Sequence, residues 1–278
     1  MDGSILGQRL LRTTEITPRP ARRSDGVTAR LVIDDDETFR EALALRYEAY
    51  VAAGYLAPRS EALFSDTHDN SSLSKTVVLY NQGEPAASVR VCMLGHRDGN
   101  ERPGDLPAAA MFRHEIDTCL DGEAAGGRRP RAVEITRLAC SPHHARDITL
   151  LMGLYHIVGY LILHFRADII FAAVTVNHAP FYRRMGFREI APARDYPGLD
   201  VQTVLMGCRT SEHRGIPGKL MSLAEISLSD DTYLGLVTGQ PVPVFGERVA
   251  SRQDLVVNQI VGARAIPQGL GAVAATIG

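Results

Sequence analysis

The 278-residue sequence lacks a strong excess of charge of either sign, because 30 lysines and arginines stand against 32 aspartates and glutamates. A large surplus of one sign is typical of proteins that bind nucleic acids or membrane surfaces, so neither role is suggested. At this length the chain can form one large domain or two small ones with a substantial core.

Paired cysteine spacings are also lacking. Cys92, Cys119, Cys140 and Cys208 stand far apart, and three of them lie within apolar runs. This pattern favours reduced, buried thiols and therefore a cytoplasmic protein, with a catalytic cysteine as the less favoured alternative.

Metal and phosphate motifs are missing as well: no zinc-type spacing, internal repeat or glycine-rich phosphate loop occurs. Asp66, His68 and Asp69 stand close together, but such residues in a loop more often cap the loop than bind an ion. We therefore expect no metal and no bound cofactor.

A membrane span is not predicted. Residues 148–165 form an apolar run in which His156 and His164 are the strongly polar residues, but this length is at the short end of the ~17–25 residues that a span needs. A strand-like run follows without a loop, so a helix packed against a sheet explains the run better. Residues 1–27 carry five arginines and no apolar run, which favours a flexible lead over a secretory signal.

Residues 131–190 contain the strongest pattern that is present. An apolar run over 132–140 is interrupted by Glu134, Thr136 and Arg137, which predicts a strand with charges inside a sheet. A helix over 146–166 and a second strand over 168–176 complete a strand–helix–strand unit. Asn177 then begins a short helix that carries Tyr182 and ends at a glycine before Phe187. This closing string resembles the signature of the GNAT acyltransferase superfamily, so we expect an α/β (α+β) fold with a mixed central sheet flanked by helices.

The first part of the chain predicts a strand over 29–33, a helix from Asp34–Asp36 to about residue 53, an irregular lid-like passage over 55–75, and strands over 76–80 and 86–94. Arg46 lies on the apolar face of the helix, and Arg90 lies inside the last of these strands. A buried guanidinium needs a partner, and Asp66 and Asp69 are the nearest acids, so we predict one charged cluster. The alternatives are that Arg46 reaches solvent and that the two aspartates only cap their loop.

Three further elements are predicted, namely a helix over 108–120, a strand over 199–207 and a short amphipathic segment over 230–237. The expected domains are a flexible lead over residues 1–28, a GNAT-like acyltransferase domain over 29–208 and a partly irregular C-terminal extension over 209–278.

Within the superfamily, the order of these motifs looks most like the acyl-homoserine-lactone autoinducer synthases and their relatives, the N-acyl amino acid synthases of the FeeM type. The resemblance rests on Arg46 with its following tyrosines, on Asp66 and Asp69, on Arg90, and on the strand Glu134-Ile135-Thr136-Arg137. Autoinducer synthases usually carry a tryptophan after the first helix, whereas this sequence has none and has Tyr55 near that place. The departure favours the amino acid branch.

The resemblance implies an acyltransferase in which Glu134 acts as general base and Tyr182 as proton donor to the leaving thiolate. Arg46, Asp66, Asp69, Arg90, Thr136 and Arg137 are the implied substrate-binding residues. From the residues alone, the alternative for Glu134 is an ion pair with Arg137, and the two interpretations are compatible. Tyr182 is equally well explained as an ordinary core aromatic.

The expected donor is an acyl-phosphopantetheine thioester on an acyl carrier protein, and the expected acceptor is an amino acid. An ordinary GNAT enzyme holds the coenzyme A diphosphate with a glycine-containing loop, but residues 141–148 contain no glycine. Arg128, Arg129, Arg131, Arg183 and Arg184 would offer a basic face to an acidic carrier protein, or would merely solvate loops. The alternative functions are autoinducer synthesis, acyl-CoA-dependent acetyl transfer and lipid binding without catalysis. No nucleic acid is expected as a partner, and no membrane contact beyond that of a lipid product.

Overall fold

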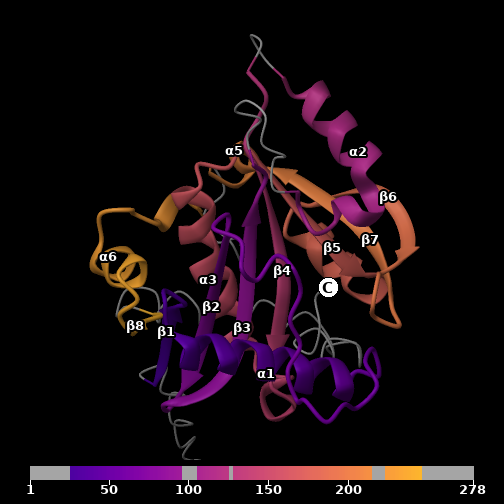
Figure 1. Cartoon of the computed structure of the whole chain (residues 1–278). Coiled ribbons are helices and arrows are strands. Elements are labelled where there is room, and N and C mark those ends of the chain that lie inside the picture. Colours follow the sequence, from indigo (N-terminus) through magenta and orange to yellow (C-terminus); the bar gives the residue numbers. More distant parts are fainter. Residues whose placement is uncertain (1–25, 96–104, 125–127, 215–222, 246–278) are drawn as a thin grey trace, which may run out of the picture.

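The computed structural model describes residues 26–95, 105–124, 128–214 and 223–245. A mixed sheet of eight strands runs through it in the order β6-β7-β5-β4-β3-β2-β1-β8 (Figure 1). Neighbouring strands are antiparallel except β4 (Ala132–Cys140) and β5 (Ile169–Thr175), which are parallel and are joined by helix α3 (Ile148–His164). The predicted strand–helix–strand unit is therefore confirmed.

The remaining strands are β1 (Val27–Leu31), β2 (Ser74–Asn81), β3 (Glu84–Met93), β6 (Arg188–Asp195), β7 (Gln202–Arg209) and β8 (Val242–Pro243). The remaining helices are α1 (Asp36–Ala52), α2 (Ala109–Gly122), α4 (Ala179–Arg184), α5 (Thr210–Arg214) and α6 (Asp231–Val237). Short 3₁₀ helices span Pro142–His144, Val176–His178 and Leu223–Glu225.

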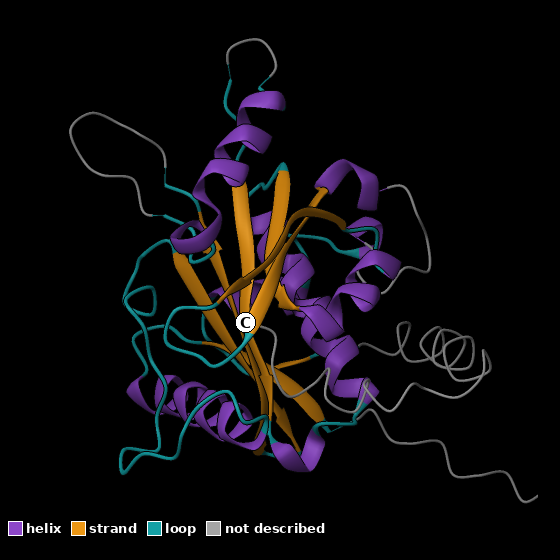
Figure 2. Cartoon of the chain, turned by 90° about the vertical axis from the view of Figure 1, so that its right-hand side faces the viewer, coloured by secondary structure: helices purple, strands orange, loops and turns teal. Residues whose placement is uncertain are grey.

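Helices cover both faces of the sheet (Figure 2). On one face, α3 and α4 pack into a large apolar core with β1 to β5. On the other face, α1 and α2 form a second core that includes Tyr50, Phe112 and Phe171. Because both faces of the central strands lie against one of these cores, Arg90 of β3 and Glu134 and Arg137 of β4 are buried.

Local sequence explains the limits of the elements. Asp35 accepts hydrogen bonds from the backbone N–H groups of Glu37 and Thr38 and so caps α1, while Gly54 adopts a positive φ of 77° beyond its end. The β2–β3 turn places Gln82 and Gly83 at positive φ, as a tight hairpin requires.

Two strands were not predicted. β6 is exposed at five of its eight positions and contains a proline, so it lacks the apolar alternation of a half-buried strand. β8 has two residues and pairs with β1, which begins two residues earlier than predicted. The short amphipathic segment over 230–237 is confirmed as α6, capped by Asp230.

Residues 223–245 pack against α3 at the edge of the sheet formed by β1 and β8. Leu223, Val244 and Phe245 are buried in the same core as α3, and a Cβ atom added at Gly159 would lie 2.3 Å from Ile226. The apolar run of α3 is thereby covered by this segment as well as by the central strands. No helix in the described part of the chain is long and apolar enough to cross a membrane. Most of the expected lead over 1–28 and the end of the expected extension lie outside the described residues.

Candidate active site

A bulge in β4 shapes the centre of the site. Opposite β4, Ser88 pairs with Ala139 and Arg90 pairs with Thr136, so three steps on β4 face two steps on β3. The extra residue is Arg137, whose φ of 52° is in the left-handed region. A bulge with a non-glycine residue at positive φ costs energy and re-aims side chains, and such features occur preferentially at functional sites.

Glu134 is the buried acid of β4 and has no exposed surface. Its Oε2 accepts a hydrogen bond of 2.7 Å from the backbone N–H of Ala108, and its Oε1 has no hydrogen-bond partner among the described residues. Burial raises the pKa of Glu134 to about 7, although the Ala108 N–H and the positive charges of Arg90 and Arg137 oppose the rise. A carboxylate of this kind can exchange a proton near neutral pH.

Arg137 pairs with Asp66 and not with Glu134, so the predicted alternative of a Glu134–Arg137 ion pair is wrong. Its Nε and one terminal nitrogen lie 2.9 and 2.8 Å from Asp66 Oδ2, and its other terminal nitrogen donates to the Tyr50 hydroxyl at 3.3 Å. The left-handed backbone at the bulge brings Arg137 to the face of β4 that carries Glu134, where Asp66 is its partner, and sequence periodicity does not reveal this.

Three aromatic rings surround the Arg137 guanidinium, whose central carbon lies 5.9, 5.0 and 5.1 Å from the ring centres of Tyr50, Phe64 and Tyr196. They come from α1, the lid-like passage and the segment after β6. Cation–π contacts of this kind join three separate parts of the chain to one side chain.

The predicted charged cluster is confirmed. Arg90 donates to both oxygens of Asp66 at 2.8 and 2.9 Å, and it shares Asp69 Oδ1 with Arg46, each at 2.6 Å. Arg46 and Arg90 have no exposed surface, so the alternative that Arg46 reaches solvent is wrong. Burial alone would raise the pKa of Asp66, but the neighbouring arginines hold that pKa well below its usual value.

The aspartates also cap their loop, so the two interpretations of Asp66 and Asp69 hold together. Asp66 accepts from the His68 N–H at 2.8 Å, and Asp69 accepts from the Asp66 N–H at 2.9 Å. Thr136 is buried directly across the strand pair from Arg90 and completes the predicted substrate-binding set at this place.

Tyr182 lies in the core on the α3 side of the sheet, whereas Glu134 lies under α2 on the other side. The hydroxyl of Tyr155 donates a 3.0 Å hydrogen bond to the hydroxyl oxygen of Tyr182, and both tyrosines are fully buried. Burial raises the pKa of Tyr182 above its ordinary value, so the hydroxyl keeps its proton near neutral pH.

Between these two faces, β4 and β5 diverge. Their ladder pairs Ala132 with Ile169, Val133 with Ile170 and Glu134 with Phe171, and it stops there although both strands continue. The β4 backbone groups that face β5 beyond Glu134 thus have no ladder partner in β5.

The start of α3 carries its own anion. The side chain of Asp147 accepts from the backbone N–H groups of Thr149 and Leu150 at 2.9 and 3.4 Å. A diphosphate bound at this helix start would need these amides. The Asp147 carboxylate already accepts their hydrogen bonds, and its negative charge would repel the diphosphate.

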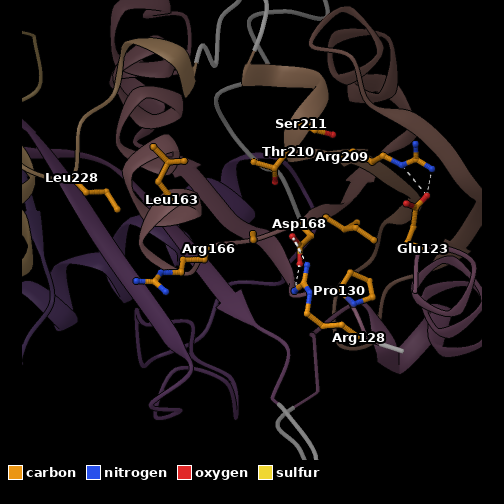
Figure 3. Close-up of a pocket in the computed structure, with 12 residues that line it drawn as sticks. Glu123, Arg128, Pro130, Leu163, Arg166, Asp168, Arg209, Thr210, Ser211 and Leu228 are labelled. Carbon is orange, nitrogen blue, oxygen red and sulfur yellow. Dashed lines mark hydrogen bonds and ion pairs between the residues drawn. The ribbon is translucent and has the colours of Figure 1, made fainter. Parts of the chain in front are cut away.

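A cavity of about 720 Å³ lies at the other end of β5 and is lined by none of the predicted catalytic or substrate-binding residues. Figure 3 shows two ion pairs in its wall, between Arg128 and Asp168 and between Arg209 and Glu123. Such paired charges offer little net charge to a ligand.

The five arginines that were predicted as a basic docking face are partly neutralised. Three of them pair with acids: Arg128 with Asp168, Arg129 with Asp117 and Arg183 with Glu189. Arg131 and Arg184 make no ion pair with any described residue. The net charge of this set is therefore smaller than the sequence suggests.

Sequence reasoning missed Ala108 and Tyr196. Ala108 acts through its backbone N–H, for which no side chain gives a signal, although the absence of any capping residue at the start of α2 is a hint. Tyr196 follows β6, and the missed strand left it in unassigned sequence.

Comparison with known proteins gives a consistent result. The family model of the N-acyl amino acid synthase FeeM matches residues 41–209, which is more than half of the chain and includes every predicted site residue. No curated protein matches the sequence. Among solved structures, FeeM from uncultured soil microbes aligns with a TM-score of 0.55 and 17% identity over 67% of this chain and 91% of FeeM. This likeness confirms the expected fold.

Two autoinducer synthases are also similar. The acyl-homoserine lactone synthase LasI aligns with a TM-score of 0.44 and 14% identity over 78% of this chain and 96% of its own. The CoA-dependent acyl-homoserine lactone synthase BjaI aligns with a TM-score of 0.48 and 10% identity over 90% of this chain and 99% of its own.

Proposed function

This chain belongs to the FeeM family of N-acyl amino acid synthases, and from that premise we propose that it transfers a fatty acyl group from an acyl carrier protein thioester to the α-amine of an amino acid. The observation that carries the proposal is the environment of Glu134, a fully buried carboxylate with one oxygen held and the other without a partner among the described residues. An attacking amine must lose a proton, and a base whose pKa is about 7 accepts it near neutral pH.

The gap between β4 and β5 is the place for the thioester arm of the donor. An extended chain can add to a strand edge as an extra strand does, and beyond Glu134 the edge of β4 that faces β5 has no ladder partner in β5. Backbone N–H groups in the same gap would face the oxyanion that develops on the thioester carbonyl.

A thioester in this gap has the base and the acid on opposite faces of the sheet. The amine nitrogen bonds to the carbonyl carbon while Glu134 Oε1 takes the amine proton, and the carbon–sulfur bond then breaks. Tyr182 gives its proton to the departing thiolate and recovers one from solvent, and Glu134 returns its own proton to solvent. The raised pKa of Tyr182 supports this role, because the hydroxyl is protonated when the thiolate forms.

The charged cluster supplies the binding site for the acceptor. Arg46, Arg90 and Arg137 outnumber Asp66 and Asp69 by one positive charge, which favours the carboxylate of an amino acid near the cluster. Thr136 lies beside Arg90 on the face of Glu134 and adds a hydroxyl. The same ion pairs fix the lid-like passage against β3 and β4.

The start of α3 supports the carrier protein as donor. Coenzyme A needs a place for its diphosphate, and the Asp147 carboxylate already caps the amides that would serve. A carrier protein presents only the pantetheine arm at this point, so the cap does not oppose it. Of the predicted docking arginines, Arg131 and Arg184 make no ion pair with a described residue, so an acidic partner can pair with them.

The test is a donor and acceptor matrix. Purified protein is supplied with acyl chains of equal length on an acyl carrier protein and on coenzyme A, together with a panel of amino acids, and products are identified by mass spectrometry. We expect N-acyl amino acids, formed preferentially from the carrier protein. Equal or better use of acyl-CoA would overturn the donor assignment, and a lactone formed from S-adenosylmethionine would overturn the acceptor assignment.

A further inference from the structure

The first turn of α2 is separated from the rest of that helix by a kink. Phe112 has φ −125° and ψ 27°, which are not helical values, and the turn before it begins at Ala108. No side chain caps this start, and no acid lies in the first turn. Backbone N–H groups at a helix start have no acceptor within the helix. Here the buried Ala108 N–H donates to Glu134 of β4, which is 26 residues away in the sequence.

One side chain holds both sides of the kink. Arg194, near the end of β6, donates to the backbone carbonyl of Met111, which belongs to the first turn. It also pairs with both carboxylate oxygens of Glu115, beyond the kink, and its guanidinium carbon lies 4.9 Å from the centre of the Phe112 ring. A planar guanidinium can make these contacts together because its donors are fixed in a fork.

We infer that Arg194 is a positioning residue for Glu134. By fixing the first turn of α2, Arg194 keeps the Ala108 N–H directed at Glu134 Oε2, and this leaves Oε1 as the oxygen that takes the proton of the acceptor amine. The inference deepens the proposed function and rests on it only in the use of Oε1 as the base.

The physical link is the orientation of a buried carboxylate. A hydrogen bond from a backbone N–H favours the charged form, so a looser first turn would weaken that bond and make Glu134 harder to ionise. The other titratable or charged groups that act on Glu134 are Asp66, Arg90, Cys92, Arg137 and Tyr196. None of these belongs to α2, so a change in the first turn leaves their charges in place.

Arg194→Gln is the direct test, and Arg209→Gln is its matched control. Arg209 makes the same kind of ion pair to the opposite end of α2, through Glu123. The Glu134 carboxyl group is titrated by NMR with ¹³C-labelled glutamate, with Glu134→Gln used to assign its signal. We expect Arg194→Gln to raise the pKa of Glu134 by about one unit, because a weaker Ala108 N–H hydrogen bond stabilises the charged form less. Arg209→Gln should leave the pKa unchanged. Equal behaviour of the two variants would overturn the inference.

A second pair of variants addresses the N–H itself. Ala108 has φ −63°, which suits proline, and Ala108→Pro deletes the donor, whereas Ala108→Ser keeps it. Because proline also restricts the residue before it, the Arg194 variants remain the primary test. The rise in pKa should appear in Ala108→Pro and not in Ala108→Ser. The opposite result would overturn the inference.

The acid limb of the pH–rate profile separates the inference from the proposed function. If Glu134 is the base, this limb should move to higher pH together with the NMR titration in Arg194→Gln. A shift of the NMR titration with no change of rate in Arg194→Gln or Glu134→Gln would support the positioning role and refute the base.

Discussion

Glu134 meets two opposed demands at the residue scale. The role of a base that we propose for it requires an ionised carboxylate, whereas its burial disfavours that charge and raises its pKa to about 7. The Ala108 N–H donates to one carboxylate oxygen only, so part of the free-energy cost of burying the charged carboxylate is not offset. A group held in this balance changes its charge within the physiological pH range.

Glu134→Gln should reduce acyl transfer by about 10²-fold or more, because loss of a general base typically has this effect. In the unsubstituted protein, the rate should rise with pH and level off above pH 7, as the carboxylate becomes fully ionised. Steady-state assays between pH 5.5 and 9 measure both effects. Turnover of the variant within a few fold of the parent would rule out the assignment.

Glu134→Gln should raise the free energy of unfolding at high pH, although it lowers the activity. The pKa of Glu134 is raised in the folded state, so its contribution to stability is complete below about 4.3, the pKa of an unfolded glutamate, and is lost as pH rises to about 7. A neutral glutamine avoids this loss, which is on the order of 3 kcal/mol. Urea unfolding at pH 5 and pH 8.5 should show a gain for the variant at pH 8.5 only. A gain of equal size at pH 5 would contradict the explanation.

Some residues were predictable because a charge interrupted an apolar pattern. Arg46, Arg90 and Glu134 stood out in this way, and the need of a buried arginine for an acid led to Asp66 and Asp69. The partner of Arg137 was not predictable, since it depends on a left-handed backbone conformation that leaves no periodic signal. Backbone donors such as the Ala108 N–H are invisible in sequence for a different reason, since every residue except proline carries one.

At the scale of elements, the lid-like passage is fixed to the sheet by ion pairs. Asp69 bridges two fully buried arginines, one on α1 and one on β3. This passage has neither helices nor strands over 55–73, so its position depends on these contacts and on Phe64 in the second core.

Asp69→Asn should lower the free energy of unfolding by roughly 3–5 kcal/mol, because it leaves two buried guanidinium groups without their shared anion. Asp117→Asn is the control, since the Asp117–Arg129 pair is exposed and its loss should cost less than about 1 kcal/mol. Urea unfolding monitored by circular dichroism measures both. The pKa of Asp69 is lowered in the folded state, so the difference should shrink as pH falls below about 4. Equal losses for the two variants would contradict a buried network.

The cap of α3 leads to a prediction about donor choice. Asp147→Ala frees two backbone N–H groups and removes a negative charge from the helix start. It should improve the use of acyl-CoA relative to acyl carrier protein several-fold, at a cost in stability of about 1 kcal/mol. Competition between the two donors in one reaction measures the ratio directly. An unchanged ratio would show that Asp147 does not exclude the diphosphate.

Elements were predictable where their burial was regular. The apolar strands β4 and β5 and helix α3 have strong patterns, and their order is as predicted. β6 was missed because an edge strand with arginines and a proline reads as a loop, although those same residues protect the edge from pairing with other chains.

At the scale of the whole molecule, α3 is almost wholly apolar because the central strands and a later segment cover it together. Residues 223–245 contribute Leu223, Val244 and Phe245 to the core around α3. Small residues admit this segment, since a Cβ atom at Gly153 would lie 3.0 Å from Val244 and 3.1 Å from Leu79 of β2. The expected domain limit at residue 208 stays a prediction, but the packing gives a reason to expect that the catalytic domain needs the later segment.

A chain that ends at residue 222 should therefore be less stable by more than about 5 kcal/mol, because several large apolar side chains lose their burial. A chain that ends at residue 245 keeps every described contact and is the matched comparison. Thermal unfolding and solubility measure the difference. If the shorter chain has the same unfolding midpoint, the covering layer contributes nothing to stability.

The late position of this covering layer has a consequence during synthesis. Roughly eighty residues separate the end of α3 from Phe245, so at 5–20 residues per second the ribosome needs about 4–16 s to supply the cover. For that time the part of this almost wholly apolar helix that residues 223–245 cover is open on the nascent chain, where chaperones or other nascent chains can bind it. Slow decoding between the two segments would lengthen this exposure, so codon choice in that interval is a factor in how much of the protein reaches its folded state.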